Sequence, residues 1–279
     1  MTGESGNLVV RARDALRDYI KAMPRPFAPP SGLPAISPTR GEIGRPKGFR
    51  QSSTPPISPL VGEMAGRPEG GAKGRGVSKS TRIKLEKNLP IASGIGGGSS
   101  DAAAALKALN RLWNAGLDEG ELAEIGIRLG ADVPMCLHAG PLVARGVGDE
   151  IEPLPGFPAL GVVLVNPGAA VATPEVFRAL RRPGNPPLPP LPERPDLDAL
   201  VGWLRTTRND LQEPAVGLAP SIAEALAEIE AERAAFARMS GSGATCFGLF
   251  GRQQDASRAA TAIRGRRPGW FVAATSMLA

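Results

Sequence analysis

The stretch that decides the fold is Pro90-Ile91-Ala92-Ser93-Gly94-Ile95-Gly96-Gly97-Gly98-Ser99-Ser100-Asp101, which runs directly into the alanine-rich segment 102–110. Four glycines in five positions allow positive φ angles and let the backbone approach a ligand closely. The serines and the aspartate then open a run of strong helix formers, as an N-cap does. A glycine loop that feeds a helix N-terminus presents unpaired N–H groups and a partial positive charge at one point. The stretch therefore predicts a phosphate-binding site.

Two well-known phosphate loops do not fit this stretch. It lacks the Lys-Ser/Thr ending of a P-loop, and Ser99 occupies the place of the third glycine in the dinucleotide-binding spacing. The alternative interpretation is a flexible Gly-Ser connector. That alternative does not explain why a helix pattern follows at once and why residues 81–85 alternate as a strand before the loop.

Composition places the chain among globular intracellular proteins. Its 279 residues can bury a sizeable core in one or two domains, although only 4% of the residues are aromatic. Cys136 and Cys246 lie far apart and give neither a disulfide framework nor metal-ligand spacing. We therefore expect a cytoplasmic protein, with no signal peptide and no segment that crosses a membrane. The sequence leaves open whether the chain forms a homodimer.

The net charge of +6 does not indicate a nucleic-acid-binding protein. Residues 1–80 contain 13 Lys and Arg against 6 Asp and Glu, a balance of +7. The remaining chain contains 20 basic and 21 acidic residues, a balance of −1. A basic face for nucleic acid would need the positive charge in the part that folds, so no nucleic-acid partner is expected.

Residues 24–78 read as an insertion between an N-terminal helix, residues 1–23, and the rest of the domain. Residues 24–80 contain 11 prolines and 10 glycines in 57 positions, above the roughly 25–30% that is typical of low-complexity chain. The octapeptide at 36–43 recurs loosely at 57–64. Two copies are too few to form a solenoid. A disordered loop of this length is tolerated because the cost of loop closure grows slowly. A proline-rich arm that binds a partner is the alternative.

Hydrophobic periodicity predicts an α+β chain. Helices are expected over 7–23, from the glycine loop to about 113, and over 117–129, 196–206, 211–216, 221–233 and about 256–264. Strands are expected over 81–85, 142–146, 149–154, 160–165, 238–240, 245–250 and 270–274, with a surface loop at 183–195.

Two further motifs accompany the glycine loop, Gly130-Ala131-Asp132-Val133-Pro134 and Arg238-Met239-Ser240-Gly241-Ser242-Gly243-Ala244-Thr245-Cys246-Phe247. Together the three segments resemble the GHMP kinases. The combination of Lys87-Asn88-Leu89-Pro90, the glycine loop and the Asp132 segment is most similar to those members of the family that phosphorylate a cytidine-diphosphate-linked methylerythritol. The resemblance implies a two-domain fold of helices packed on mixed or antiparallel sheets. Residues 79–155 would form the N-terminal, ATP-binding domain, and residues 156–279 the C-terminal domain.

The resemblance also implies the roles of individual residues. Asp132 would act as general base on the substrate alcohol; taken alone, an aspartate in a loop is more often a cap or turn residue. ATP would be bound, with Mg²⁺ implied by the chemistry rather than by ligand spacing. The residues expected to hold ATP are Pro90, Ile91, Ala92, Ser93, Gly94, Ile95, Gly96, Gly97, Gly98, Ser99, Ser100, Gly241, Ser242 and Gly243. Ser99 and Ser100 can equally be plain helix caps, and Gly241–Gly243 a tight turn. If both glycine segments bind ATP, they must meet in space.

On the substrate side, the resemblance assigns Thr173 and Phe177 to the cytidine end, with the Phe177 ring stacked on the base. A core phenylalanine is the alternative for Phe177. Asn209-Asp210 matches a pair at a helix start, where capping is the expected role. The single histidine, His138, has no partner in the sequence and is interpreted as structural.

The family's N-terminal strand, with its lysine and asparagine, and its Gly-Tyr-His substrate segment have no match in this sequence. We therefore expect an N-terminally truncated kinase in which the N-terminal strands are missing. An inactive nucleotide-binding remnant, or another GHMP kinase of the homoserine or mevalonate type, are the alternative functions.

Overall fold

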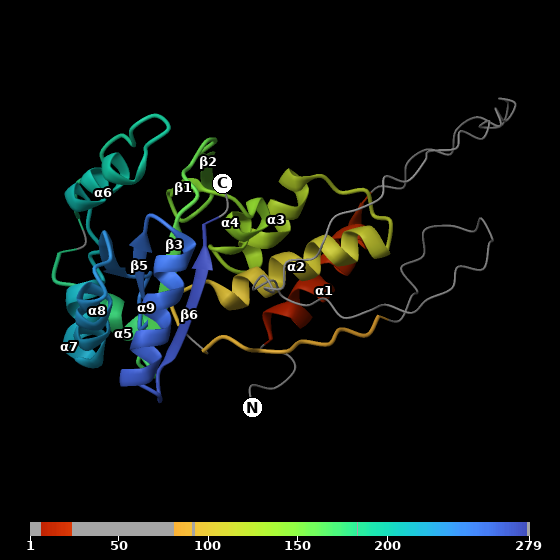
Figure 1. The fold of residues 1–279 in the computed structure, drawn as a ribbon. Helices are drawn as coiled ribbons and strands as arrows, with labels where there is room; N and C mark the ends of the chain where they lie inside the picture. Colours follow the sequence, from red (N-terminus) through yellow and green to blue (C-terminus); the bar gives the residue numbers. More distant parts are fainter. Residues whose placement is uncertain (1–6, 24–80, 91–92, 183, 278–279) are drawn as a thin grey trace, which may run out of the picture.

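The computed structural model describes residues 7–23, 81–90, 93–182 and 184–277. The insertion expected at 24–78 lies outside these residues, as do Ile91 and Ala92 of the glycine loop. The described residues form an α+β structure, in which one group consists of helices and the other is built on an antiparallel sheet. Figure 1 shows the helices α1 to α4 on one side and the sheet with α8 and α9 on the other.

The helical group packs around α2 (Gly97–Leu112), which contacts α1 (Leu8–Ala22), α3 (Glu119–Leu129) and α4 (Val133–His138). Two of these helices have side-chain N-caps. The Asn7 side chain accepts a hydrogen bond from the Val9 N–H group, and Asp118 forms a reciprocal capping box. The buried core of the group consists of Ala12, Leu16, Ala102, Ala103, Leu106, Leu109, Leu117, Leu122, Ile125, Leu129, Val133 and Leu137.

The larger sheet centres on β3 (Gly161–Asn166), an almost entirely buried strand, as its continuous apolar run predicts. It pairs antiparallel with β5 (Cys246–Phe250) on one side and with β6 (Phe271–Ser276) on the other. At one edge β4 (Phe236–Met239) pairs with β5, which gives the order β4-β5-β3-β6.

Both faces of this sheet are covered by apolar side chains, because successive residues of a strand point to opposite faces. Val163 and Val165 pack in one cluster with α8 (Ser221–Ala231) and α9 (Gln253–Arg266). Val162 and Leu164 belong to a second cluster with α6 (Leu197–Thr206). On this second face, the hairpin of β1 (Leu142–Arg145) and β2 (Glu150–Pro153) contributes to the lining of an apolar cavity of about 460 Å³. Two short helices, α5 (Thr173–Ala179) and α7 (Gln212–Leu218), complete the fold.

Most of the expected elements are confirmed to within a few residues, and one is wrong. Residues 81–85 form no strand, and none of the strands in the described part of the chain pairs with them. Alternation in the sequence makes a strand only where a neighbouring strand supplies hydrogen bonds. The loop at 184–195 lies largely exposed, as expected. Among the described residues, no helix combines the length and the apolar character that crossing a membrane requires.

Two glycine substitutions test the packing of α8 on the sheet. A methyl group at Gly248 of β5 would lie 2.3 Å from the Ile229 Cγ2 atom of α8, whereas one at Gly265 of α9 would meet no atom within 4 Å. We expect Gly248→Ala to lower the free energy of unfolding by about 1–3 kcal/mol through overpacking. Gly265→Ala should raise it by about 0.5–1 kcal/mol through helix propensity. Urea unfolding measures both, and equal effects would contradict this packing.

Candidate phosphate-binding site

The first N–H groups of α2 have no acceptor inside the helix. The helix begins at Gly97, its N-cap is Gly96 with φ of 67°, and the first helical hydrogen bond runs from the Ser100 N–H group to the Gly96 carbonyl at 2.8 Å. By helix geometry the N–H groups of Gly97, Gly98 and Ser99 therefore have no acceptor within α2. Unpaired donors at the positive end of a helix are suited to an anion.

The expected serine cap of α2 is wrong. No side chain caps this helix, and Ser99 and Ser100 lie inside its first turn. The reason is the glycine at position 96, which takes a left-handed conformation at no steric cost and turns the chain into the helix earlier than the serines would. Their hydroxyl groups therefore make no capping hydrogen bond at the start of α2.

The second glycine segment, defined here as Ser240–Gly243, is the turn between β4 and β5. Its Ser240 hydroxyl donates a hydrogen bond of 2.8 Å to the Gly94 carbonyl. Two residues after the turn, the Thr245 N–H group donates to the Ser93 carbonyl at 3.2 Å. The expectation that the two glycine segments meet in space is thereby confirmed.

Gly94 is required for this meeting. Its φ angle is +73°, and a β-carbon there would lie 2.5 Å from the Ser240 carbonyl oxygen and 2.7 Å from that of Gly243. Real β-carbons do not approach backbone atoms so closely, so any larger residue would push the two segments apart.

Asp132 stands immediately before α4 with an exposed side chain that makes no capping hydrogen bond in the helix. Its φ and ψ angles of −83° and −10° are helical. Val133, the residue directly before Pro134, begins α4, and the proline lies in the first turn of the helix, where its missing N–H group costs nothing. The carboxylate remains available to a ligand.

Cys136 joins the aspartate segment to the start of α2. Its thiol accepts a hydrogen bond of 3.4 Å from the Ser100 hydroxyl, and its N–H group donates to the Asp132 carbonyl. Burial raises the pKa of the Cys136 thiol, the Ser100 hydrogen bond opposes that shift, and the Asp132 charge adds to it. Farther along α2, the Lys107 ammonium donates to the Leu137 carbonyl. These contacts place Asp132 beside the glycine loop.

Of the two residues expected on the substrate side, Thr173 contacts the second glycine segment. The hydroxyl groups of Thr173, at the start of α5, and Ser242 lie 2.8 Å apart. Phe177, one turn later, is 56% exposed, whereas its neighbour Val176 is the buried residue of α5. The core interpretation of Phe177 is therefore wrong, because the helix turns its other face to the core.

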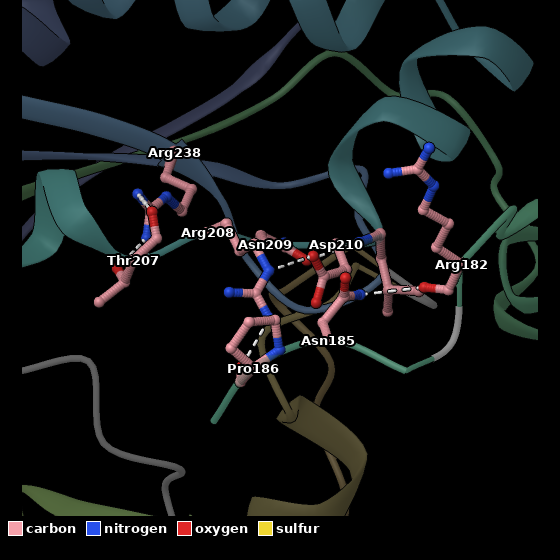
Figure 2. A network of polar contacts seen from close by, with 9 residues as sticks. Arg182, Asn185, Pro186, Thr207, Arg208, Asn209, Asp210 and Arg238 are labelled. Carbon is pink, nitrogen blue, oxygen red and sulfur yellow. Dashed lines mark hydrogen bonds and ion pairs between the residues drawn. The ribbon is translucent and has the colours of Figure 1, made fainter. Parts of the chain in front are cut away.

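Sequence reasoning missed part of the role of Asn209. Its Oδ1 atom accepts a hydrogen bond from the Leu211 N–H group at 3.0 Å, as the capping interpretation expects. Its amide group also donates to the Met239 and Gly241 carbonyls. Figure 2 shows Asn209 between Arg208 and Asp210, which form an ion pair of 2.7 Å. No local signal predicts a contact across 30 residues of sequence.

Several other polar residues have structural partners. Lys87 pairs with Asp101 at 3.0 Å, and His138 lies 3.9 Å from a Glu119 oxygen. In the described ranges, His, Cys, Asp and Glu side chains form no group of three that could hold a metal ion. Burial raises the pKa of the Cys246 thiol, which lies in the sheet core, to about 12.

Comparisons with known proteins identify the family of the chain. Residues 64–140 match the model of the GHMP kinases N terminal domain, and residues 193–267 match that of the GHMP kinases C terminal domain. The first match begins inside the segment interpreted as an insertion.

Two curated relatives from different bacteria carry the same name. A 4-diphosphocytidyl-2-C-methyl-D-erythritol kinase of Mesorhizobium japonicum is 57% identical over 202 residues, which are 72% of this chain and 68% of that protein. A kinase of the same name from Brucella melitensis is 58% identical over 193 residues, 68% of this chain and 64% of that protein.

Solved structures extend the likeness. A crystal structure of 4-(cytidine 5'-diphospho)-2C-methyl-D-erythritol kinase superposes with a TM-score of 0.57 at 38% identity, covering 70% of each chain. A homoserine kinase from Cytophaga hutchinsonii has a TM-score of 0.54 at 18% identity, covering 70% of this chain and 69% of that one, a likeness of fold alone.

A pair of glycine substitutions tests whether the two glycine segments depend on Gly94. Gly116 has nearly the same φ angle, +72°, but a β-carbon there would meet no atom within 4 Å. We expect Gly116→Ala to cost about 1–2 kcal/mol of unfolding free energy through its left-handed backbone alone. Gly94→Ala should cost about 1–3 kcal/mol more because it also collides with the turn. Equal losses in urea unfolding would show that the close approach is unimportant.

Proposed function

The chain belongs to the GHMP kinase family, and from that premise we propose that it transfers the γ-phosphate of ATP to the 2-hydroxyl group of 4-diphosphocytidyl-2-C-methyl-D-erythritol. This is a step of non-mevalonate isoprenoid precursor biosynthesis. The observation that carries the proposal is the meeting of the two glycine segments at the start of α2, with Asp132 joined to the same place through Cys136. The names of the relatives at 57 and 58% identity support this substrate. The homoserine kinase likeness supports only the fold.

The phosphates of ATP would be held at the N-terminus of α2. The free N–H groups of Gly97, Gly98 and Ser99 supply donors, and the helix end supplies positive partial charge. Gly241, Ser242 and Gly243 would close over the phosphates from the opposite side. Pro90 and Ser93–Gly96 would line the ATP site. Ile91 and Ala92 would line it as well, although they lie outside the described residues.

Magnesium fits these residues without a dedicated protein cage. Mg²⁺ keeps several water ligands and is usually bound through few protein oxygens together with substrate phosphates. The hydroxyl groups of Ser99 and Ser100, which cap no helix, would hold the ion beside the ATP phosphates. Once bound, the ion supplies neutralisation of phosphate charge.

Asp132 would orient the substrate hydroxyl and accept its proton as the oxygen attacks the γ-phosphorus. Phosphoryl transfer asks of a protein mainly positioning, charge stabilisation and such a base. The carboxylate suits the role because it is exposed, forms no cap of α4 and stands next to the start of α2.

The cytidine end of the substrate would bind across α5. The exposed ring of Phe177 offers a face on which the base can stack, and Thr173 stands beside Ser242 of the second glycine segment. This arrangement would hold the substrate next to the phosphates of ATP.

Replacement of the proposed base tests the reaction. Asp132→Asn keeps the shape of the side chain but removes its basicity, so ADP release with ATP, Mg²⁺ and the diphosphocytidyl substrate should fall by about 10²–10⁴-fold. Asp198→Asn, an exposed residue of α6, is the matched control and should keep full turnover. Turnover by Asp132→Asn equal to that of the unaltered chain would contradict the role. Preference of the unaltered chain for homoserine or mevalonate would contradict the proposed substrate.

Replacement of Phe177 tests the substrate side. Stacking of a base on an aromatic ring is worth about 1–3 kcal/mol. Phe177→Ala should therefore raise KM for the diphosphocytidyl substrate by about 5- to 150-fold and leave KM for ATP unchanged. Leu218→Ala removes an apolar side chain that is 50% exposed and should change neither constant. If Phe177→Ala behaves like Leu218→Ala in steady-state kinetics, the ring does not contact the base.

A further inference from the structure

Asn209 holds the second glycine segment with both hydrogens of its amide group. The Nδ2 atom donates to the Met239 carbonyl at 2.9 Å and to the Gly241 carbonyl at 2.8 Å. An amide group carries two donors, and here one binds the last carbonyl of β4 while the other binds a carbonyl of the turn. A side chain that only caps a helix needs an acceptor and no donor, so these two contacts are unexplained by capping.

Three further backbone N–H groups at the end of β4 and in the turn donate hydrogen bonds. The Met239 N–H group donates to the Gln212 Oε1 atom of α7 at 3.0 Å. Within the turn, the Ser240 N–H group donates to the Thr245 carbonyl, and the Gly243 N–H group to the Ser240 carbonyl. The start of α7 therefore fixes the end of β4, and the turn that follows is held at its base.

The turn that Asn209 holds is hydrogen-bonded in turn to the first glycine loop. Ser240 lies between the two carbonyl groups that Asn209 binds, and its hydroxyl donates to the Gly94 carbonyl. A shift of the turn by a fraction of an ångström would break this hydrogen bond or press on Gly94. The turn lies so close to Gly94 that no space remains for a β-carbon there. Tightly packed segments transmit displacements. Asn209 therefore acts on Gly94 through two successive contacts, its own hydrogen bonds to the carbonyl groups beside Ser240 and the Ser240 hydrogen bond to Gly94.

We propose that Asn209 is a positioning residue that holds the second glycine segment against Gly94 and thereby sets the affinity of the site for the triphosphate of ATP. The proposal rests on the proposed function, since it assigns a task to residues around the same phosphates. It assigns Asn209 no contact with ATP.

Two substitutions at Asn209 separate positioning from capping and from charge. Asn209→Asp keeps the oxygen that accepts from the Leu211 N–H group but turns both donors into an oxygen that faces two carbonyl groups. Asn209→Ala removes the donors without adding charge. Capping alone predicts that Asn209→Asp is harmless, charge alone predicts that Asn209→Ala is harmless, and positioning predicts that both are defective.

The matched control is Asn185→Asp. Asn185 also donates from its amide to a backbone carbonyl, that of Arg182 at 3.0 Å, and it lies near Arg208 and Asp210 in Figure 2. The same substitution there changes the same chemical group outside the glycine turn.

Two readouts decide the proposal. In the full chain without nucleotide, backbone amide exchange followed by mass spectrometry should become at least about fivefold faster over residues 239–245 in both Asn209 variants. Calorimetric titration with a non-hydrolysable ATP analogue and Mg²⁺ should show Kd raised by about tenfold or more. KM for ATP should rise correspondingly with kcat little changed, and Asn185→Asp should match the unaltered chain throughout.

Unchanged exchange over 239–245 in either Asn209 variant would overturn the proposal, as would unchanged affinity for the analogue. If the unaltered chain binds no ATP analogue, the proposed function fails instead. The exchange measurement then still decides by itself whether Asn209 holds the turn.

Discussion

The contact between the Ser240 hydroxyl and the Gly94 carbonyl is the interaction on which the site depends. It joins a turn of the sheet to the loop that begins the longest helix of the helical group, across 146 positions of sequence. The contact forms only because residue 94 has no side chain, and the Thr245–Ser93 hydrogen bond runs beside it. Without this junction, α2 would still present its free N–H groups, but nothing would face them.

Around the junction, each neighbouring element contributes a different chemical property. The N-terminus of α2 contributes donors and positive partial charge, and α4 contributes an exposed carboxylate next to it. The start of α5 brings a hydroxyl group to the tip of the turn, and the start of α7 holds its base. Phosphoryl transfer needs mainly the placement of charged groups, so a site assembled from the ends of four helices is well suited to it.

The sequence predicted most of the elements and the meeting of the glycine segments, because apolar periodicity and glycine clustering are local signals. It failed where a distant partner decides the outcome. Residues 81–85 alternate, but the described residues offer them no neighbouring strand. The serine cap of α2 failed for a local reason, because Gly96 takes a left-handed conformation at no steric cost and starts the helix ahead of the serines. The amide contacts of Asn209 lie about 30 residues from it in sequence, and residue type alone could not distinguish them from a helix cap.

The central claim is that the two glycine segments and Asp132 form one site for phosphoryl transfer. A crystal structure of the chain with Mg²⁺, a non-hydrolysable ATP analogue and 4-diphosphocytidyl-2-C-methyl-D-erythritol tests it most directly. The account predicts the phosphates on the N–H groups of Gly97–Ser99, with Gly241–Gly243 over them and the substrate hydroxyl between the γ-phosphate and the Asp132 carboxylate. Phosphates bound away from the start of α2, or a substrate hydroxyl out of reach of Asp132, would contradict it.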